Sequence, residues 1–402
     1  MIYIVRHGQT AGNKAKVLQG CGSNHPLNEE GIRQAEAVRK WILEQLIHFD
    51  ILFTNGVEAS GKEKKMIRMT TAPGKLKNLL ILTALMLAIS AQVLFAAPGQ
   101  VTNASNGASQ NGWLHVNGTQ LVNEQGHAVV LHGMSSHGLQ WFSQYATRNA
   151  IGATAAYGAN LFRVAMYTKE GGYLSQKQAI MKKLYAAVDA AISRNMYVII
   201  DWHILSDGNP KSHQRAAKIF FRKVSQRYGN TPNVIYEICN EPNGGTSWSD
   251  IREYAETVIP VIRKNAPDSV IIVGTPTWSQ DVDQAAAEPL EDQKNIMYTL
   301  HFYAATHKEN LRDKLKSARE AGLPIFISEF SICDASGNGG IDYDSADAWF
   351  QMINDYNLSY AGWNISNKNE SSALIKSDCK KTSGWTDDEL SETGLWLKNT
   401  MK

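Results

Sequence analysis

The segment that decides the fold class is Val234-Ile235-Tyr236-Glu237-Ile238-Cys239-Asn240-Glu241-Pro242. Its apolar run is short and rich in β-branched and aromatic residues, which is typical of a buried parallel strand, and Glu241 follows directly after it. A second apolar run at 324–327 leads in the same way to Glu329. A carboxylate after such a strand lies at the mouth of an α/β barrel, where that fold carries out its chemistry. The two segments therefore predict a barrel with two acidic groups at its carboxyl end.

Apolar runs of this kind recur along the chain, and helical patterns separate most of them. The expected strands are 129–134, 161–164, 198–202, 234–238, 270–273, 296–300, 324–327 and 360–364. The expected helices are 176–194, 212–228, 250–264, 308–321, 345–356 and 387–400. Eight strands, most of them separated by helices, predict a (β/α)8 TIM barrel. A doubly wound sheet is the alternative, but the first strand lacks the glycine-rich turn of that fold.

Before the first of these strands, Asn117-Gly118 lies between two short apolar runs. This dipeptide predicts a β-hairpin, which we expect to cap the bottom of the barrel.

The chain as a whole divides into four unequal pieces. They are a non-domain fragment at 1–55, a signal peptide at 66–97, a linker at 98–112 and a catalytic barrel at 113–402.

Composition narrows the class of protein and its partners. The 402 residues suffice for one barrel plus further segments, and a net charge of +2 gives no electrostatic footprint for nucleic acid. Ten tryptophans are many for this length and suit the packing of sugar rings on aromatic faces. The four cysteines lack metal-binding spacing. Neither a metal nor an organic cofactor is expected. The sequence does not decide whether Cys333 and Cys379 form a disulfide, whereas Cys239 in its apolar strand is expected to be a free thiol.

Residues 79–97 form one apolar run, LLILTALMLAISAQVLFAA, with Lys75 and Lys77 before it. A basic region, an apolar region and a small-residue end predict a secretory signal peptide, for which Met66 or Met69 would be the natural start. A transmembrane helix is the alternative, because the run approaches the ~20 residues that span a bilayer. We therefore expect a bacterial protein that is secreted or periplasmic, without a membrane segment after cleavage.

Residues 1–55 have a different character. A strand-like run precedes Arg6-His7-Gly8-Gln9-Thr10, and a helical pattern follows it. This opening resembles that of the histidine phosphatase (phosphoglycerate mutase-like) superfamily, in which the histidine of the Arg-His-Gly motif takes up a phosphoryl group. The second arginine, the carboxylate and the second histidine of that family have no counterpart further along. A piece of about fifty residues also buries too little surface to be a reliable domain. The resemblance predicts a truncated, non-functional fragment, with a phosphatase acting through His7 as a remote alternative.

Polar and aromatic residues gather at or just past the ends of the expected strands. They are His137, Arg163, His203, Asn240, Glu241, His301, Tyr303, Glu329 and Trp363. Because the carboxyl ends of barrel strands meet at one face, we expect these residues to form one site. Two glutamates there suggest an acid and a nucleophile on either side of a glycosidic bond. The histidines could equally suggest zinc, but no His-x-x-x-His or cysteine spacing supports it.

Seven motifs, taken in order, resemble those of glycoside hydrolase family 5 and especially its bacterial endoglucanases. They are Gly133-Met134-Ser135-Ser136-His137-Gly138-Leu139-Gln140-Trp141, Asn160-Leu161-Phe162-Arg163, Asp201-Trp202-His203, Asn240-Glu241-Pro242, His301-Phe302-Tyr303, Ser328-Glu329-Phe330 and Gly362-Trp363-Asn364-Ile365-Ser366-Asn367-Lys368. The resemblance covers about residues 110–400. It implies a β-1,4-glucanase that retains the anomeric configuration.

The same resemblance assigns roles to residues of this chain. Glu241 would be the general acid/base, which must carry a proton for the leaving oxygen, and Glu329 would be the ionised nucleophile. Arg163 and Tyr303 would donate hydrogen bonds to the nucleophile. The remaining candidates would bind substrate: Asn240 the sugar 2-hydroxyl, His301 the acid or the cleavage point, His137 and His203 the glycone side, Trp141, Trp278 and Trp363 the sugar faces, and Lys368 and Glu370 glucose hydroxyls.

The sequence thus leads to a secreted, monomeric endo-β-1,4-glucanase that acts on cellulose-type glucans by a retaining double displacement. A related β-glycanase acting on mannan, xylan or mixed-linkage glucan is the alternative, because a few cleft residues decide the substrate and the fold does not. A non-catalytic carbohydrate-binding barrel is a third hypothesis, against which the presence of both glutamates argues.

Overall fold

Eight parallel strands form a closed barrel in the computed structural model, which describes residues 107–401. Around the barrel the order is β10-β3-β4-β5-β6-β7-β8-β9, so the last strand pairs with the first. The strands are β3 (His132–Ser136), β4 (Leu161–Tyr167), β5 (Tyr197–His203), β6 (Val234–Glu237), β7 (Ile271–Val273), β8 (Ile296–Tyr303), β9 (Ile325–Ser331) and β10 (Tyr360–Ile365). The predicted TIM barrel is confirmed, and the doubly wound sheet is wrong because that sheet is open at two edges.

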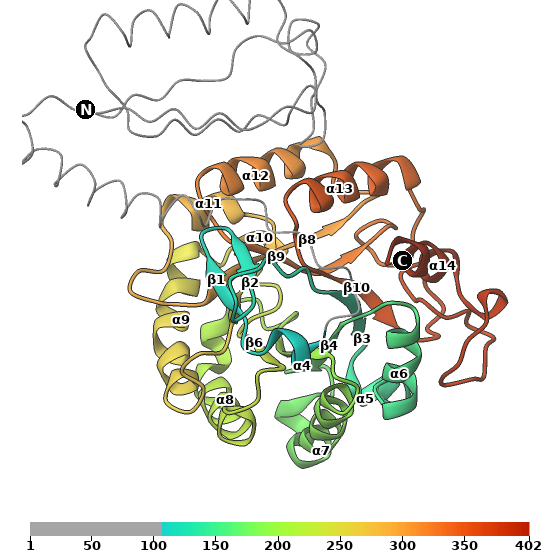
Figure 1. Ribbon diagram of the computed structural model, residues 1–402, viewed down its shortest axis with the longest axis horizontal. Helices are drawn as coiled ribbons and strands as arrows, with labels where there is room; N and C mark the ends of the chain where they lie inside the picture. The colour runs from blue at the N-terminus through green and yellow to red at the C-terminus, as the bar shows by residue number, and fades with distance from the viewer. Residues whose placement is uncertain (1–106, 402) are drawn as a thin grey trace, which may run out of the picture. The chain divides into compact units, whose positions relative to one another are not determined.

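Helices surround the strands (Figure 1). The longer ones are α6 (Arg148–Ala156), α7 (Tyr173–Ile192), α8 (Gln214–Tyr228), α9 (Trp248–Arg263), α12 (Glu309–Glu320), α13 (Tyr343–Asp355) and α14 (Glu392–Thr400). Shorter turns of helix are α4 (Ala108–Asn111), α5 (Leu139–Phe142), α10 (Pro276–Ser279) and α11 (Val282–Ala287), with 3-10 helices at Ser143–Tyr145, Pro210–His213 and Asp387–Glu389. These helices bury the outer faces of the strands.

The short helices α4, α5, α10 and α11 were not predicted, and two of the longer helices also differ from the sequence prediction. Helix α6 has no counterpart among the expected helices, because its small alanine and glycine residues give a weak apolar pattern. The single helix expected over 387–400 is instead a 3-10 turn followed by α14. Ser391 separates them, since its side chain accepts the N–H of Gly394 and begins α14 as a helix cap.

Side chains of β4 alternate between the helical shell and the barrel interior. Phe162, Val164 and Met166 belong to the large apolar cluster between strands and helices. Leu161 belongs instead to the apolar cluster that fills the lower interior, and Arg163, the next inward residue, is fully buried. The interior therefore changes from apolar to charged along the strand, and the charged part lies toward the carboxyl end.

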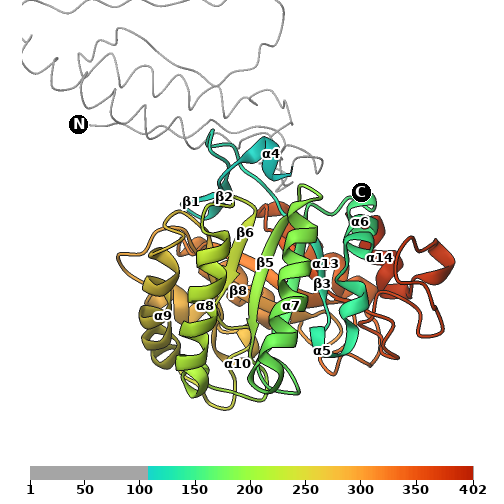
Figure 2. The same cartoon turned by 90° about the horizontal axis from the view of Figure 1, so that it is seen from below.

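A hairpin closes the amino end of the barrel. Strands β1 (His115–Asn117) and β2 (Gln120–Val122) are antiparallel, and Leu114 and Leu121 join the lower interior cluster. In Figure 2 this hairpin lies at one end of the barrel, while α5 and α10, which follow β3 and β7, lie toward the other. The predicted cap is confirmed. The linker predicted to reach residue 112 ends earlier, because α4 packs Ala108 into the same cluster.

Strand β9 contains a bulge near its carboxyl end. Its pairing with β8 slips by one residue between Thr299 and His301, so β9 holds one residue more over this interval. A bulge interrupts the alternation of side chains along a strand. Ser328 and Glu329, although adjacent in sequence, therefore both contact charged groups of the barrel interior.

The described cysteines are buried and free. Burial raises the pKa of the Cys239 thiol, which fits the inert thiol predicted for this position. Cys333 and Cys379 do not form the disulfide that the sequence left undecided. The sulfur of Cys333 instead lies 3.3 Å from the hydroxyl of Ser331.

The predictions for 1–55 and 66–97, and for the linker as far as 106, lie outside the described residues. Within 107–401, no helix combines the length and the apolar character that crossing a bilayer requires.

Candidate active site

A cavity of about 670 Å³ opens at the carboxyl end of the barrel. Most of the residues predicted for the site line it: His137, Trp141, His203, Glu241, Trp278, His301, Tyr303, Glu329, Trp363, Lys368 and Glu370. The other two, Arg163 and Asn240, are fully buried behind this lining and bond to each other. Strand ends far apart in the sequence thus bring their polar residues to one place.

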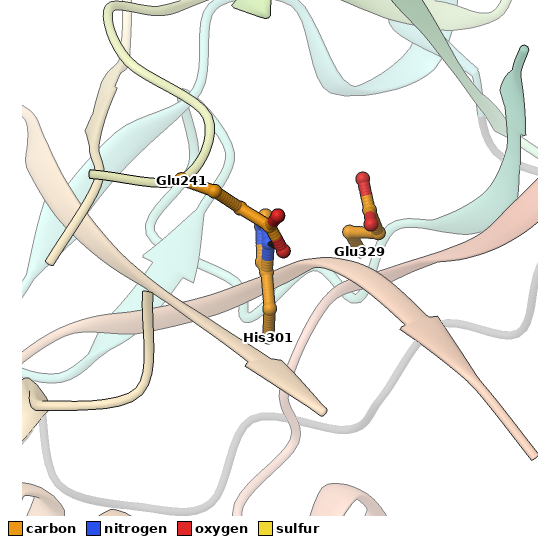
Figure 3. A group of neighbouring side chains, drawn as sticks. All are labelled: Glu241, His301 and Glu329. Atoms are coloured by element: carbon orange, nitrogen blue, oxygen red, sulfur yellow. Dashed lines mark hydrogen bonds and ion pairs between the residues drawn. The ribbon is translucent and has the colours of Figure 1, made fainter. Parts of the chain in front are cut away.

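Glu241 and Glu329 face each other across the cavity (Figure 3). One oxygen of each carboxylate and one ring nitrogen of His301 all lie within 4.8 Å of one another. Retaining glycosidases hold their two carboxyl groups about 5–5.5 Å apart, whereas inverting enzymes leave about 6.5–9.5 Å for a water molecule. Oxygens within 4.8 Å of each other are too close for the inverting spacing and are compatible with the retaining one.

Each oxygen of Glu329 accepts a strong hydrogen bond. Arg163 Nη1 donates to Oε2 at 2.9 Å, and the hydroxyl of Tyr303 donates to Oε1 at 2.8 Å. Burial, together with the charges of Glu329 and Glu241, raises the pKa of Tyr303 well above its usual range, so the hydroxyl keeps its proton. The two donors orient the Glu329 carboxylate and complement its negative charge.

Arg163 is the centre of a buried ionic network. Besides Glu329, it contacts Glu237 through Nε at 2.7 Å, and its Nη2 contacts Asp201 at 2.9 Å and Asn240 at 2.6 Å. Burial alone would lower the pKa of Arg163, but the surrounding carboxylates raise it, so the guanidinium is charged. For Glu237 the directions are reversed. Burial alone would raise the pKa of this carboxyl, but Arg163 and His301 lower it to about 2. A fixed positive charge therefore lies directly behind the nucleophile candidate.

Glu241 contacts a different partner, the ring of His301. Its Oε1 lies 3.0 Å from Nδ1, and Nε2 of the same ring lies 2.9 Å from the hydroxyl of Ser328. That hydroxyl donates onward to Glu237 at 2.6 Å. Burial alone would lower the pKa of His301, but Glu237 and Glu241 raise it to about 9. A charged His301 can therefore donate a hydrogen bond to Glu241 whenever Glu241 is ionised.

Known proteins match the chain over this barrel. The family described as Cellulase (glycosyl hydrolase family 5) matches residues 122–369. The chain belongs to glycosyl hydrolase family 5. The endoglucanase of Clostridium saccharobutylicum is 47% identical to it over 313 residues, which are 77% of this chain and 70% of that protein. Endoglucanase A of Butyrivibrio fibrisolvens is 46% identical over 293 residues, which are 71% and 68% of the two chains.

Solved structures agree with this family 5 assignment. The crystal structure of the catalytic domain of a Thermobifida fusca endoglucanase has a TM-score of 0.71 and 38% identity, and the match covers 73% of this chain and 98% of that one. A variant of that domain, solved in complex with cellotetraose, has a TM-score of 0.70 with the same identity and coverage. The predicted family and enzyme class, a glycoside hydrolase of the endoglucanase type, are confirmed.

A second family, the histidine phosphatase superfamily (branch 1), matches residues 2–55. This match agrees with the resemblance predicted from Arg6-His7-Gly8. It covers only a small part of the chain and lies outside the described residues, so it adds nothing to the family 5 site.

Two histidines in the family 5 cavity have defined ring orientations. Nδ1 of His137 accepts the N–H of Gly138 at 2.7 Å, so the ring proton is on Nε2, which lies 4.0 Å from Glu370. Nδ1 of His203 lies 2.6 Å from Asp201, which leaves Nε2 as an acceptor. Burial is the main reason that the pKa of His137 is lowered to about 4 and that of His203 to about 3. Both rings can therefore bind hydroxyl groups without carrying charge.

Exposed tryptophans stand on opposite walls of the cavity. Trp141 follows β3 and Trp278 follows β7, and these strands are four places apart in a ring of eight. Their side chains are 48% and 47% exposed, whereas Trp363 is only 7% exposed. Trp278 lies in a stretch, 277–279, whose left-handed φ angles are unfavourable for L-residues. The backbone N–H of Trp278 donates to the carbonyl of Pro242 at 2.9 Å. This bond joins the tryptophan to the loop that carries Glu241.

Lys368 and Glu370 form an ion pair of 2.6 Å at the edge of the cavity. The other oxygen of Glu370 accepts a hydrogen bond from the side chain of Asn364 in β10 at 3.0 Å. The pair offers a cationic donor and an anionic acceptor side by side, which suits the hydroxyl groups of a sugar.

Several residues that build the site were not predicted as site residues, although some of them stand in the segments quoted above. Glu237 and Asp201 stand inside apolar runs, and a charge in such a run is a signal of a buried partner. Ser328 gave no comparable signal, because a serine next to a glutamate is unremarkable in sequence. Tyr167 and Glu170 line the cavity from the end of β4 and the loop after it, where no expected strand reached.

Glu241, His301 and Glu329 together offer three atoms that could hold a metal ion. They fit a cation poorly, because both oxygens of Glu329 already accept hydrogen bonds and the Arg163 guanidinium lies 2.9 Å away. The expectation that no metal takes part remains a prediction.

Proposed function

We propose that this family 5 barrel hydrolyses internal β-1,4-glucosidic bonds of cellulose-type glucans by a retaining double displacement. The observation that carries the proposal is a pair of carboxylates within 4.8 Å of each other in unequal surroundings. Glu329 has a charged donor and a hydroxyl donor, as an ionised nucleophile requires. Among residues 107–401, the side-chain partner of the Glu241 carboxylate is the titratable ring of His301, as a group that gives up and regains a proton requires.

In the first step an oxygen of Glu329 attacks the anomeric carbon, and the glycosidic bond to the leaving sugar breaks. Glu241 gives its proton to the departing oxygen, so the leaving chain departs as an alcohol. The charged His301 stabilises the carboxylate that forms on Glu241, because its Nδ1 lies 3.0 Å away. The product of this step is a glycosyl ester on Glu329.

In the second step a water molecule attacks the same anomeric carbon from the face that the leaving sugar vacated. Glu241 takes a proton from the water, and the bond between sugar and Glu329 breaks. Arg163 and Tyr303 assist, since they stabilise the carboxylate that is released. Two inversions give net retention of configuration.

The predicted binding residues fit this reaction unequally. Trp141, His137 and the Lys368–Glu370 pair would hold the glycone side, and Trp278 on the opposite wall would hold the leaving side. Asn240 is already engaged, because its oxygen accepts from Arg163 and its nitrogen lies 3.1 Å from the carbonyl of Ile204. Its contact with the sugar 2-hydroxyl would therefore use the amide hydrogen that now points toward His203 Nε2, 3.3 Å away.

Glutamine variants test the two glutamates. E241Q and E329Q should each lower hydrolysis of carboxymethylcellulose by at least about 10²-fold, the ordinary contribution of such groups. E320Q, which removes one exposed carboxylate on α12, is the matched control and should leave the rate unchanged. Proton NMR of the first product formed should detect the β-anomer. Full activity in either active-site variant, or an α-anomer as first product, would end the proposal.

The preferred polymer and the location are further parts of the proposal. The two relatives compared above are named endoglucanases, which supports cellulose-type chains over mannan, xylan or mixed-linkage glucan. A panel of these polymers separates them. The apolar run at 79–97 supports export, so sequencing of the secreted product should find a start near Ala97. H7A should leave glucanase activity unchanged, and a large loss would make the phosphatase-like segment integral to the enzyme.

A further inference from the structure

Glu170 is a carboxylate of the cavity wall that the reaction above does not use. It lies in the loop between β4 and α7 and lines the cavity together with Trp141, Tyr167 and Leu205. Trp141 is the exposed platform of the glycone wall, and its ring contacts that of Tyr167 at 5.1 Å between centroids. Glu170 therefore belongs to the glycone part of the cavity.

The backbone around Glu170 is fixed. Its own φ of +51° is left-handed, which costs free energy for a residue with a Cβ and persists where contacts enforce it. The side chain of Gln140, in α5, donates to the carbonyl of Glu170 at 3.3 Å. Within the loop, the N–H of Gly172 donates to the carbonyl of Lys169 at 2.7 Å. These contacts hold the backbone of Glu170 at a defined place in the wall.

The two carboxylate oxygens of Glu170 have different surroundings. Oε1 accepts a hydrogen bond from the hydroxyl of Ser206, in the loop after β5. Oε2 is shielded from solvent and has no hydrogen-bond partner among residues 107–401. The other cavity-edge carboxylate, Glu370, is instead paired with Lys368 at 2.6 Å. A shielded acceptor without a partner is costly, so a turn of the carboxylate that brings Oε2 to a donor of the ligand would be stabilising.

We propose that Glu170 contacts the substrate, as an acceptor for a glucosyl hydroxyl on the glycone side, and that its charge selects neutral glucans over anionic ones. This inference rests on the proposed function, because it needs a glucan in the cavity. A sugar hydroxyl is a donor that a carboxylate binds well. A sugar that carries a carboxylate at the same position places a second negative charge next to that of Glu170. Like charges in contact repel, so such a sugar binds less well.

The test compares two soluble polymers with the same backbone, neutral hydroxyethylcellulose and anionic carboxymethylcellulose. E170Q keeps the size of the side chain and its ability to accept from Ser206, but it removes the charge. The ratio of kcat/KM for the anionic polymer to that for the neutral one should rise on the order of fivefold at low salt. At about 0.5 M salt the wild-type ratio should approach that of the variant, because like charges are screened. E320Q, with the same change in net charge outside the cavity, should behave as wild type at every salt concentration.

A second measurement reports the hydroxyl contact itself. E170A should raise KM for cellopentaose on the order of tenfold with little change in kcat, the size expected for a hydrogen bond to a charged group. The inference would be overturned if E170Q had the same ratio of kcat/KM for the two polymers as the wild type, or if E170A had an unchanged KM. Hydrolysis of neutral polymer by the wild-type protein tests the proposed function separately, so the failure of one is distinguishable from the failure of the other.

Discussion

Replacement of Arg163 by methionine tests the buried ionic network behind the site. Methionine keeps most of the length of the side chain but removes the charge that faces Asp201, Glu237 and Glu329. In the folded protein the pKa of Glu237 is about 2 rather than 4.5, which corresponds to roughly 3 kcal/mol of stabilisation near neutral pH. Burial opposes this shift, so loss of Arg163 leaves the cost of burying the carboxylates uncompensated. We expect the free energy of unfolding to fall by about 3–5 kcal/mol.

The assay is urea unfolding followed by tryptophan fluorescence, at neutral and at acidic pH. Because the folded-state pKa of Glu237 is depressed, its stabilisation is present above pH 4.5 and is lost as the pH falls through about 2. The difference between R163M and wild type should therefore shrink with acid. R227M is the matched control, since Arg227 pairs with Asp189 where both side chains are about half exposed, and it should cost under about 1 kcal/mol.

A loss of less than about 1 kcal/mol in R163M near neutral pH would refute the reasoning, as would a loss that acid does not diminish. If R163M does not fold, R163K supplies the measurement. Lysine keeps the charge, but its compact ammonium cannot reach all the acceptors that the planar guanidinium of Arg163 contacts from three nitrogens. We therefore expect a smaller loss of stability than in R163M and a large loss of activity.

Three further substitutions give separable outcomes. E241A should slow hydrolysis of cellobiosides with poor leaving groups by about 10²–10⁴-fold while sparing bond cleavage in a dinitrophenyl cellobioside, and equal losses for both would contradict its role as acid. The stabilisation that His301 provides is the free energy of unfolding of the wild type minus that of H301Q, both measured in urea. It should be full below pH 6.5 and fall by roughly 3 kcal/mol as the pH rises through about 9. A pH-independent difference would contradict it. W278A should raise KM for cello-oligosaccharides about fivefold, from the loss of about 1 kcal/mol of face contact, and an unchanged KM would remove Trp278 from the binding surface.

Much of this site could be predicted because catalytic residues of a barrel follow its strands. Glu241 and Glu329 were found from the apolar runs before them, and the closed barrel then made their proximity a consequence of topology. The eight strands were found for the same reason. Strands buried on both faces give near-continuous apolar runs, which are a strong signal even without a neighbouring motif.

The remainder depended on geometry that a pattern of residue types does not carry. Strict alternation predicts that only one of Ser328 and Glu329 faces inward, and the bulge in β9 turns both inward. The left-handed turn that presents Trp278 is unfavourable by local preference, and hydrogen bonds such as that from the backbone N–H of Trp278 to Pro242 hold it. Glu170 lies in a loop without apolar periodicity, so only its place in the cavity wall reveals it.

The central claim is that Glu329 forms a covalent bond to the sugar while Glu241 handles the proton. Incubation with a 2-deoxy-2-fluoro-cellobioside bearing a good leaving group should slow the second step and let the glycosyl-enzyme accumulate. Mass spectrometry of the digested protein should then locate one 2-deoxy-2-fluoro-cellobiosyl group on the peptide containing Ser328-Glu329-Phe330. A label on the peptide containing Asn240-Glu241-Pro242, or inactivation without any label, would contradict the account.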